Sequence, residues 1–264
     1  MSDRYAHRAL KKFSQNFLNQ PALADKIVAA LNLTPDDTVV EIGPGPGVLT
    51  RRLSNRTLHK LYAIELDPRW YEHLIEQNFP QLHLIQADFQ EWPLLSVHEP
   101  GHPLKVIGNI PYHITSPILF RLRDHHRYIR QAVIMMQKEV AHRLTARPGS
   151  KAYGILSVGL GAFARIERLF DIGRKNFSPP PAVDSSVVRF SFYKDVKGLN
   201  NPALFIQIVR AVFNYRRKML RNSLSRILDP AVVYSLQSVP LDTRPEQLSI
   251  EQFIHLSNEI NNKR

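Results

Sequence analysis

Residues 39–47 read Val39-Val40-Glu41-Ile42-Gly43-Pro44-Gly45-Pro46-Gly47, and this stretch decides the fold. The apolar run predicts a short buried β-strand, and the glycines predict a tight turn into a helix that begins near residue 48 or 49. Glycine adopts positive φ at little cost and lets the backbone pass close to a ligand. A strand, a glycine-rich turn and a helix in this order are typical of α/β proteins that bind nucleotide-like cofactors.

The spacing of the glycines narrows the class of ligand. Gly43, Gly45 and Gly47 form G-x-G-x-G with prolines between them, whereas a dinucleotide site has G-x-G-x-x-G. Proline lacks an N–H group, so this loop offers fewer donors to a pyrophosphate. No Gly-Lys-Ser or Gly-Lys-Thr follows, which excludes a P-loop. The loop therefore favours a ligand without phosphate, such as S-adenosylmethionine.

Short apolar runs recur along the first two thirds of the chain, and most are separated by segments with helical spacing. Near-continuous apolar strands that alternate with helices predict a parallel sheet covered on both faces, with ligands at the carboxyl ends of the strands. Two further strands are expected at 165–172 and 185–192, after helices at 138–146 and 155–162. The earlier runs are residues 39–42, 61–64, 82–85, 104–107 and 132–136.

A domain boundary is expected near residues 194–202, where glycine, asparagine and proline cluster. Beyond it, apolar residues follow the spacing of one helix face from Phe205 to Phe213. We therefore predict an α/β domain over residues 1–196 and a small, all-helical C-terminal domain over residues 197–264.

Acidic residues follow two more of the predicted strands. Glu65 ends the second strand, 65 − 47 = 18 residues after Gly47, close to the roughly 20 expected for the acid that binds a ribose diol; Asp67 is a second candidate. Asp88 follows the third strand, where it can accept a hydrogen bond from an adenine amino group while Phe89 flanks the ring. Each acid alone could be a helix N-cap. Together with the glycine loop, they predict one cofactor site across three strands.

Residues 109–112 read Asn109-Ile110-Pro111-Tyr112 at the end of another apolar run. They offer a side-chain amide oxygen, a backbone carbonyl stiffened by proline and an aromatic face, which together suit a flat base with an exocyclic amine, such as a flipped-out adenine. We expect Asn109 Oδ1 and the Ile110 carbonyl to accept the two amine hydrogens, with Tyr112 stacked on the base. Phe177 is a candidate for the opposite face, and core packing is its alternative role.

The charge and composition point to a polyanionic partner. The formal net charge is +12, the sequence pI is about 10.0, and there are no cysteines, which excludes disulfides, thiolate metal sites and cysteine nucleophiles. The start of the chain is polar, and no apolar run is long enough to span a bilayer, so we expect a cytoplasmic protein.

Residues 210–226 include several basic residues and no acidic one, and we predict that this segment contacts RNA. Positions 210, 217 and 221 are expected to share one helix face. The basic residues of this segment are Arg210, Arg216, Arg217, Lys218, Arg221 and Arg226, and the N-terminal Arg4, Arg8, Lys11 and Lys12 form a second basic stretch.

Five motifs occur in an order that resembles the small-subunit ribosomal RNA adenine dimethyltransferases. The resemblance covers nearly the whole chain, through residues 214–218. Its one clear departure is His113, where the family often has asparagine, so a hydrogen bond from position 113 is not carried over. The motifs are Phe13–Leu18, Glu41–Gly47, Asn109–Tyr112, Gln137–Val140 and Phe177–Ser185.

The resemblance implies a class I, Rossmann-like methyltransferase with a seven-stranded, mostly parallel sheet and a helical C-terminal domain. It implies dimethylation, with S-adenosylmethionine and no metal, of two adjacent adenines in a hairpin loop near the 3′ end of 16S rRNA. Asn16 and Leu18 would close over the methionine end, Gly43 would lie against the cofactor, Glu65 would bind its ribose and Asp88 its adenine. Asn109 would bridge cofactor and target. The expected partner is the small ribosomal subunit or its precursor, and the expected state is a monomer.

Three other functions stay open from the sequence. They are a large-subunit rRNA methylase of the antibiotic-resistance kind, a DNA adenine methylase and a non-catalytic assembly factor that kept the fold. The C-terminal basic segment and the motif at 177–185 weigh against the two enzymes, and the intact glycine loop and acids weigh against loss of chemistry. The histidine pairs His125–His126 and His98/His102 lack a metal-ligand pattern, and we expect them at the surface.

Overall fold

The computed structural model describes residues 16–196 and 198–263. The chain forms two compact units: the first comprises Met1–Ala141 and Arg165–Lys194, and the second comprises His142–Ala164 and Asp195–Arg264. The second unit is therefore larger than the predicted helical domain at 197–264, because residues 142–164 belong to it as well.

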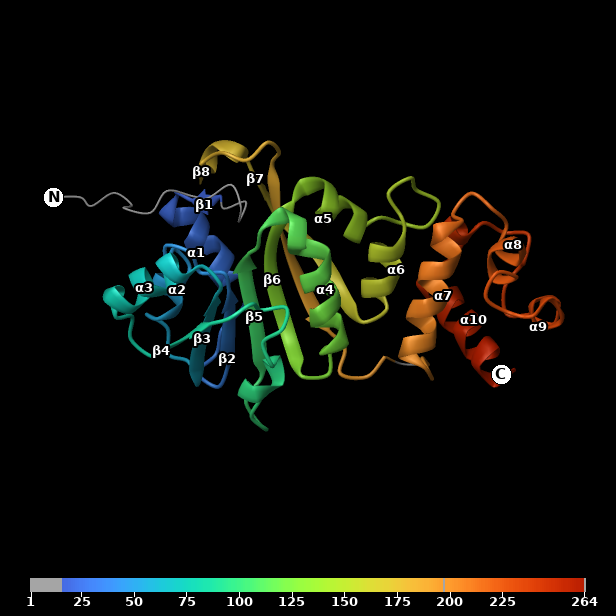
Figure 1. Ribbon diagram of the computed structural model, residues 1–264, viewed down its shortest axis with the longest axis horizontal. Coiled ribbons are helices and arrows are strands. Elements are labelled where there is room, and N and C mark those ends of the chain that lie inside the picture. The colour runs from blue at the N-terminus through green and yellow to red at the C-terminus, as the bar shows by residue number, and fades with distance from the viewer. Residues whose placement is uncertain (1–15, 197, 264) are drawn as a thin grey trace. The chain divides into compact units, whose positions relative to one another are not determined.

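The first unit is built on a seven-stranded sheet with strand order β4-β3-β2-β5-β6-β9-β7. All four pairs among β4, β3, β2, β5 and β6 are parallel, whereas β9 is antiparallel to β6. This confirms the predicted mostly parallel sheet, and β2, β3, β5 and β6 can be followed in Figure 1. The strands are β2 (Thr38–Ile42), β3 (Lys60–Glu65), β4 (Leu82–Gln86), β5 (Leu104–Asn109), β6 (Ile129–Gln137), β7 (Ala164–Ile172) and β9 (Ser185–Phe192).

Helices connect the parallel strands, and local sequence sets their ends. Helix α3 begins after Asp67, whose side chain accepts a hydrogen bond from the Arg69 N–H, and it ends at Asn78 in the left-handed conformation. A short ribbon, β1 (Phe17–Leu18) with β8 (Phe177–Ser178), forms a separate two-stranded sheet. The helices are α1 (Pro21–Ala29), α2 (Thr50–Leu53), α3 (Pro68–Gln77), α4 (Thr115–Asp124) and α5 (Lys138–Leu144), with 3₁₀ turns η2 (Leu94–Val97), η3 (Tyr112–Ile114) and η4 (Arg174–Asn176).

The core of this unit packs α1 and α2 against the central strands. Val39, Leu61, Ile107 and Val133 come from four adjacent strands and are fully buried, together with Ile27 of α1. Burial of large aliphatic side chains contributes about 1.5–3 kcal/mol each. The strand that precedes the glycine loop is therefore fixed on both sides by apolar contacts.

A buried ion pair lies at the amino end of β5. Lys105 Nζ is 2.7 Å from Asp37 Oδ2, and it also donates hydrogen bonds to the carbonyls of Leu31 and Asn32 at 3.0 and 2.8 Å. Both charged side chains are almost fully buried. The lysine inside the apolar run at 104–107 therefore ties the end of α1 to the start of β2 and β5.

The second unit is helical, and aromatic side chains fill its centre. Phe205, Phe213 and Phe253 pack with Tyr153 and Phe163, which come from the segment 142–164. This packing explains why that segment belongs to the second unit. None of the helices in the described part of the chain is long and apolar enough to cross a membrane. The helices of the second unit are α6 (Ile155–Gly161), α7 (Pro202–Asn214), α8 (Leu220–Leu224), α9 (Pro230–Tyr234) and α10 (Ile250–Asn262), with the 3₁₀ turn η5 (Pro245–Gln247).

Candidate active site

A cavity of about 340 Å³ opens at the carboxyl edge of the parallel strands. This volume lies at the lower end of the range for small-molecule sites. The ends of β2, β3 and β5, the loop after β4 and the short strand β1 line it. The predicted site residues in its wall are Asn16, Leu18, Gly43, Gly45, Glu65, Asp88, Phe89, Asn109, Ile110, Pro111 and Tyr112.

The three glycines of the loop all have positive φ but serve different purposes. A Cβ at Gly43 would meet nothing within 4 Å, so this part of the wall is open to a ligand. A Cβ at Gly45 would lie 2.7 Å from a ring carbon of Phe17, which the sequence analysis did not assign to the site. Gly47 does not line the cavity, and a Cβ there would lie 3.0 Å from Leu74 of α3. The predicted ligand contact of Gly47 is therefore corrected to close helix packing.

Glu65 is held rigidly at the end of β3. Its Oε2 accepts a hydrogen bond from the Gly45 N–H at 2.9 Å, and its Oε1 accepts one from the Asp67 N–H at 2.8 Å. Burial raises the pKa of the Glu65 carboxyl, and the two backbone donors oppose that rise. Asp67 is engaged as the N-cap of α3 and pairs with Arg69 at 2.5 Å. Of the two candidate acids, Asp67 is thus taken up by a helix cap and an ion pair, whereas the hydrogen bonds to Glu65 come from backbone N–H groups.

Glu41 is a second buried carboxyl beside the cavity. Its Oε2 accepts a hydrogen bond from Thr50 Oγ1 at 2.7 Å, and the side chain is almost fully buried. Burial raises the pKa of Glu41 to about 8. The carboxyl is therefore mostly protonated at pH 7, which keeps a second negative charge away from Glu65.

The loop after β4 presents Asp88 and Phe89 to the cavity. Asp88 Oδ1 accepts a hydrogen bond from the Gln90 N–H at 2.8 Å, which fixes the carboxylate. The Phe89 ring is almost completely buried and has the Arg121 guanidinium carbon 5.9 Å from its centroid. The loop thus places a carboxylate acceptor next to an apolar ring in the cavity wall, and the adenine that they are expected to bind stays a prediction.

Asn109 stands at the end of β5 with its side chain already oriented. Its Nδ2 donates a hydrogen bond to the Asn16 carbonyl at 2.8 Å, whereas nothing in residues 16–196 or 198–263 donates to its Oδ1. The amide oxygen is thus the acceptor that remains for a ligand. Tyr112, two residues beyond Ile110, is half-buried, and its Oη lies 2.8 Å from Ser185 Oγ in a shared hydrogen bond. Ser185 was not predicted from the sequence as a partner of Tyr112.

Phe177 does not line the cavity. It is only 3% exposed and packs in the apolar core, and its backbone pairs with Leu18 in the β1–β8 ribbon. The proposed stacking position opposite Tyr112 is therefore corrected to the core-packing alternative. Leu18 and Phe17, on the paired strand, face the cavity instead.

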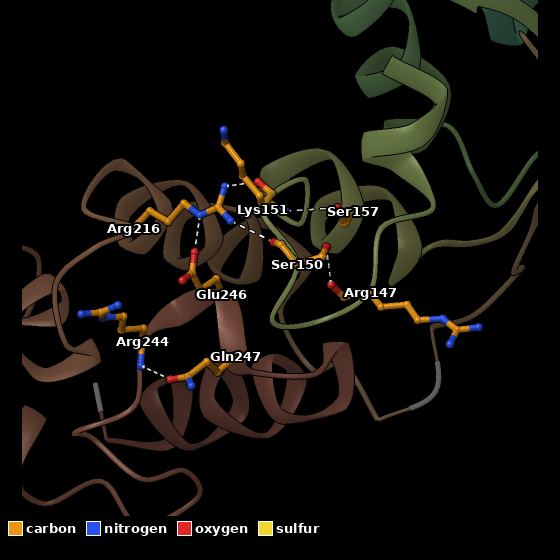
Figure 2. A network of polar contacts seen from close by, with 9 residues as sticks. Arg147, Ser150, Lys151, Ser157, Arg216, Arg244, Glu246 and Gln247 are labelled. Atoms are coloured by element: carbon orange, nitrogen blue, oxygen red, sulfur yellow. Dashed lines mark hydrogen bonds and ion pairs between the residues drawn. The ribbon is translucent and has the colours of Figure 1, made fainter. Parts of the chain in front are cut away.

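The basic segment of the second unit is interrupted by a turn. Helix α7 ends at Asn214 and α8 begins at Leu220, so the expected single helix face through positions 210, 217 and 221 is wrong. Arg216 holds the unit together: its Nε is 2.5 Å from Glu246, and its guanidinium donates to the carbonyls of Ser150 and Lys151 at 3.0 and 2.7 Å (Figure 2).

The other basic residues differ in what they contact. Arg210, Arg217 and Lys218 are exposed, Arg221 pairs with Asp242, and Arg226 lies over the Tyr215 ring at 4.2 Å. The N-terminal basic stretch and residues 13–15 of the first motif lie outside the described residues. Arg217 and Lys218 are thus exposed cations whose side chains make no ion pair or ring contact among residues 16–196 and 198–263.

The glycine loop, the two strand-end acids and the Asn109–Tyr112 segment converge on one cavity. A model of the family "Ribosomal RNA adenine dimethylase" matches residues 6–262. The chain belongs to this family.

Relatives of this dimethylase match along the full length. A protein of Chlorobium chlorochromatii named ribosomal RNA small subunit methyltransferase A is 42% identical, over 97% of this chain and 95% of its own. A protein of the same name from Pseudomonas savastanoi is 38% identical, over 100% and 98%. A dimethyladenosine transferase from Plasmodium falciparum superposes with a TM-score of 0.79 at 25% identity, over 94% of this chain and 98% of its own. The 23S rRNA methyltransferase ErmE gives a TM-score of 0.70 at 26% identity, over 93% and 100%.

The dimethylase also has a cluster of possible metal ligands at the opposite, amino edge of its sheet. Donor atoms of His59, Glu99 and His102 lie within 4.8 Å of one another. However, Glu99 already accepts from His59 at 2.9 Å and pairs with Lys60, and the two imidazoles stack with centroids 3.4 Å apart. An ion lies near the plane of each imidazole that binds it, and two stacked rings cannot both meet that condition. We assign the cluster a structural role.

The histidines singled out in the sequence are placed differently from one another. His126 is buried, and its Nδ1 lies 2.6 Å from the Tyr193 carbonyl, so its expected surface placement is wrong. His125 lies against the Arg121 carbonyl at the end of α4. Both rings are thus held by backbone carbonyls of the first unit.

Proposed function

We propose that this dimethylase transfers methyl groups from S-adenosylmethionine to the exocyclic amines of two adjacent adenines in the 3′-terminal hairpin loop of 16S rRNA. The products are N6,N6-dimethyladenosines, formed during biogenesis of the small ribosomal subunit. One observation carries the proposal: an acceptor pair and an aromatic ring at Asn109–Tyr112 lie in the wall of the same cavity as Gly43, Glu65 and Asp88.

The cavity fits the cofactor at three points. Gly43 leaves room where a side chain would otherwise project, Glu65 offers carboxylate oxygens to a ribose diol, and Asp88 offers one to an adenine amine. Asn16 and Leu18 line the remaining wall, where the methionine end would lie. Bound there, S-adenosylmethionine supplies an electrophilic methyl group, and the proposed chemistry uses no metal.

The residues of the Asn109–Tyr112 segment prepare the target nitrogen. The lone pair of an adenine amine is delocalised into the ring, which makes it a poor nucleophile. Asn109 Oδ1 and the Ile110 carbonyl accept its two hydrogens and draw the nitrogen towards tetrahedral geometry. Orientation of this kind lowers a barrier by up to ~7–11 kcal/mol in well-aligned systems. Fixed dipoles also stabilise the positive charge that develops on nitrogen.

Tyr112 holds the extruded base by stacking. A base on an aromatic ring gains roughly 1–3 kcal/mol, which offsets part of the cost of unstacking it from the RNA. For the second methyl transfer the amine gives up one of its two hydrogen bonds, because one hydrogen has been replaced.

The RNA partner is expected to contact the exposed cations of the second unit. Arg217 and Lys218 are free to meet phosphates, with Arg210 and Arg221 nearby in sequence, whereas Arg216 is engaged in the fold. Such binding weakens steeply as salt rises because counterions are released. We propose a monomer that acts in the cytoplasm on a subunit particle.

A large-subunit rRNA target is the second candidate. The likeness to the 23S rRNA methyltransferase ErmE over 93% of the chain favours it. The full-length relatives are named ribosomal RNA small subunit methyltransferase A, and this favours the small subunit.

The test is a labelled-methyl assay on small subunits that lack the modification, with large subunits in parallel, followed by mapping of the modified bases. Two adjacent dimethyladenosines in the small-subunit rRNA are the expected product. Asn109→Ala should abolish transfer and leave the fold intact. Methylation of the large subunit alone, or single-turnover activity retained by Asn109→Ala, would contradict the assignment.

A further inference from the structure

The stacking residue of the site has a buried partner that belongs to a distant part of the chain. Tyr112 Oη lies 2.8 Å from Ser185 Oγ, across 73 residues of sequence. Ser185 is the first residue of β9 and is 0% exposed. The hydrogen bond fixes the far end of the Tyr112 ring axis. Because a phenol hydroxyl prefers to lie in the plane of its ring, the bond also restrains the tilt of the ring.

We propose that Ser185 is a positioning residue that sets the angle at which Tyr112 meets the target base. The inference rests on the proposed function, since it assumes that Tyr112 stacks on the base. Ser185 itself does not line the cavity and acts only through the tyrosine.

The serine can serve as a fixed point because the start of β9 is anchored on both sides of it. The Lys138 N–H donates to the carbonyl of Asp184 at 3.0 Å. Ser186 Oγ donates to Asp171 Oδ1 at 2.6 Å, and the other oxygen of Asp171 lies 2.8 Å from Lys138 Nζ. The backbone of Ser185 is also in register with the end of β6. Its neighbours thus connect β9 to β7 and to the start of α5, which leaves little freedom at Ser185.

The consequence for the reaction is geometric. A misplacement of about 1 Å in a reacting group costs on the order of a hundredfold in rate, so a small change in ring tilt is felt at the amine. The second transfer is the more sensitive step, because the amine then has one hydrogen bond fewer to hold it. Without the Ser185 hydroxyl, monomethyladenosine should accumulate relative to the dimethylated product.

The experiment compares Ser185→Ala, Tyr112→Phe and the double variant in single turnovers on unmodified small subunits. Each single variant should slow transfer about five- to tenfold, the loss expected for one net hydrogen bond. The double variant should be no slower than either single one, rather than showing the product of their effects. KM for the subunit and the Kd of S-adenosylmethionine should stay unchanged, and the share of monomethyladenosine should rise.

Ser257→Ala is the matched control. Ser257 is a fully buried serine of α10 whose hydroxyl has no hydrogen-bond partner among the described residues. Its loss should change neither rate nor product ratio. Tyr112→Phe keeps the serine in place, so it tests the bond even where Ser185→Ala does not fold.

Three results would overturn the proposal: multiplicative effects in the double variant, a Tyr112→Phe enzyme with wild-type rate and product ratio, or a Ser185→Ala variant altered only in melting temperature. A wild-type protein that methylates no adenine in either subunit would refute the proposed function, and the positioning role with it. Defects confined to the variants bear on the positioning role alone.

Discussion

Replacing Gly45 by alanine adds a single methyl group, and we expect it to disturb both the fold and the cofactor cavity. Its φ is +52°, and a methyl group at its Cβ would lie 2.7 Å from Cε1 and 3.1 Å from Cδ1 of Phe17. Left-handed backbone costs an L-residue about 1–2 kcal/mol, and an overpacked contact adds about 1–3 kcal/mol. Gly45→Ala should therefore lower the free energy of unfolding by about 2–5 kcal/mol.

The same substitution should weaken cofactor binding. Phe17 lines the cavity and packs edge-on against Trp70 with centroids 5.0 Å apart, so it must move towards the ligand space or lose that contact. The Gly45 N–H also holds Glu65 at 2.9 Å, and a shifted backbone releases that carboxylate. We expect the Kd of S-adenosylmethionine to rise by at least tenfold, the equivalent of about 1.4 kcal/mol.

Urea unfolding and equilibrium dialysis with labelled cofactor measure the two effects. Gly149→Ala is the control for backbone strain alone, since Gly149 has φ +83° and nothing within 4 Å of its Cβ position. Gly45→Ala combined with Phe17→Leu should recover part of the lost stability, because the smaller side chain can yield. A Gly45→Ala protein as stable as Gly149→Ala, with unchanged cofactor affinity, would refute the reasoning.

Three further outcomes are expected. Lys105→Met leaves Asp37 buried without its cation and should lower the free energy of unfolding in urea by about 3–5 kcal/mol. Adding Asp37→Leu should restore most of this stability. A double variant as unstable as the single one would contradict a paired role. The pKa of Glu41 is about 8 in the folded state and near 4.5 in the unfolded state, so between these pH values only the folded state keeps the proton. The free energy of unfolding therefore falls as pH rises through this window. Glu41→Gln should flatten this decline in melting curves taken from pH 5 to 8.5, and an unchanged slope would count against a protonated Glu41. Arg217→Ala should weaken binding to subunits and reduce the salt dependence of that binding, with an unchanged melting temperature. Arg216→Ala should instead lower the melting temperature. The reverse pattern would show that Arg216 faces the RNA.

The sequence placed most of the sheet correctly because its signals are local. The strand at 185–192 and the helix that follows the glycine loop depend on apolar spacing and turn residues within a few positions. The acids at the strand ends were found for the same reason, since parallel strands bring their carboxyl ends to one edge. The alternative role of Asp67 as a helix N-cap was also predicted from the sequence, and the structure confirms it.

Other features depended on packing between distant segments. An aromatic residue beside prolines fits a cavity wall or a core equally well, and only the pairing of Phe177 with Leu18 placed it in the core. Positions 210, 217 and 221 have helical spacing, yet the helix ends at Asn214. Spacing alone does not reveal where a chain must turn to close a small aromatic core.

By itself, then, the order of residues determined the α/β sheet, the glycine loop and the groups that converge at its carboxyl edge, because backbone propensity and side-chain period act over short distances. Only the tertiary structure decided that Gly47 packs against a helix, that Arg216 braces the second unit and that Ser185 holds Tyr112. These contacts join residues far apart in the chain, and their formation depends on which surfaces the whole fold brings together.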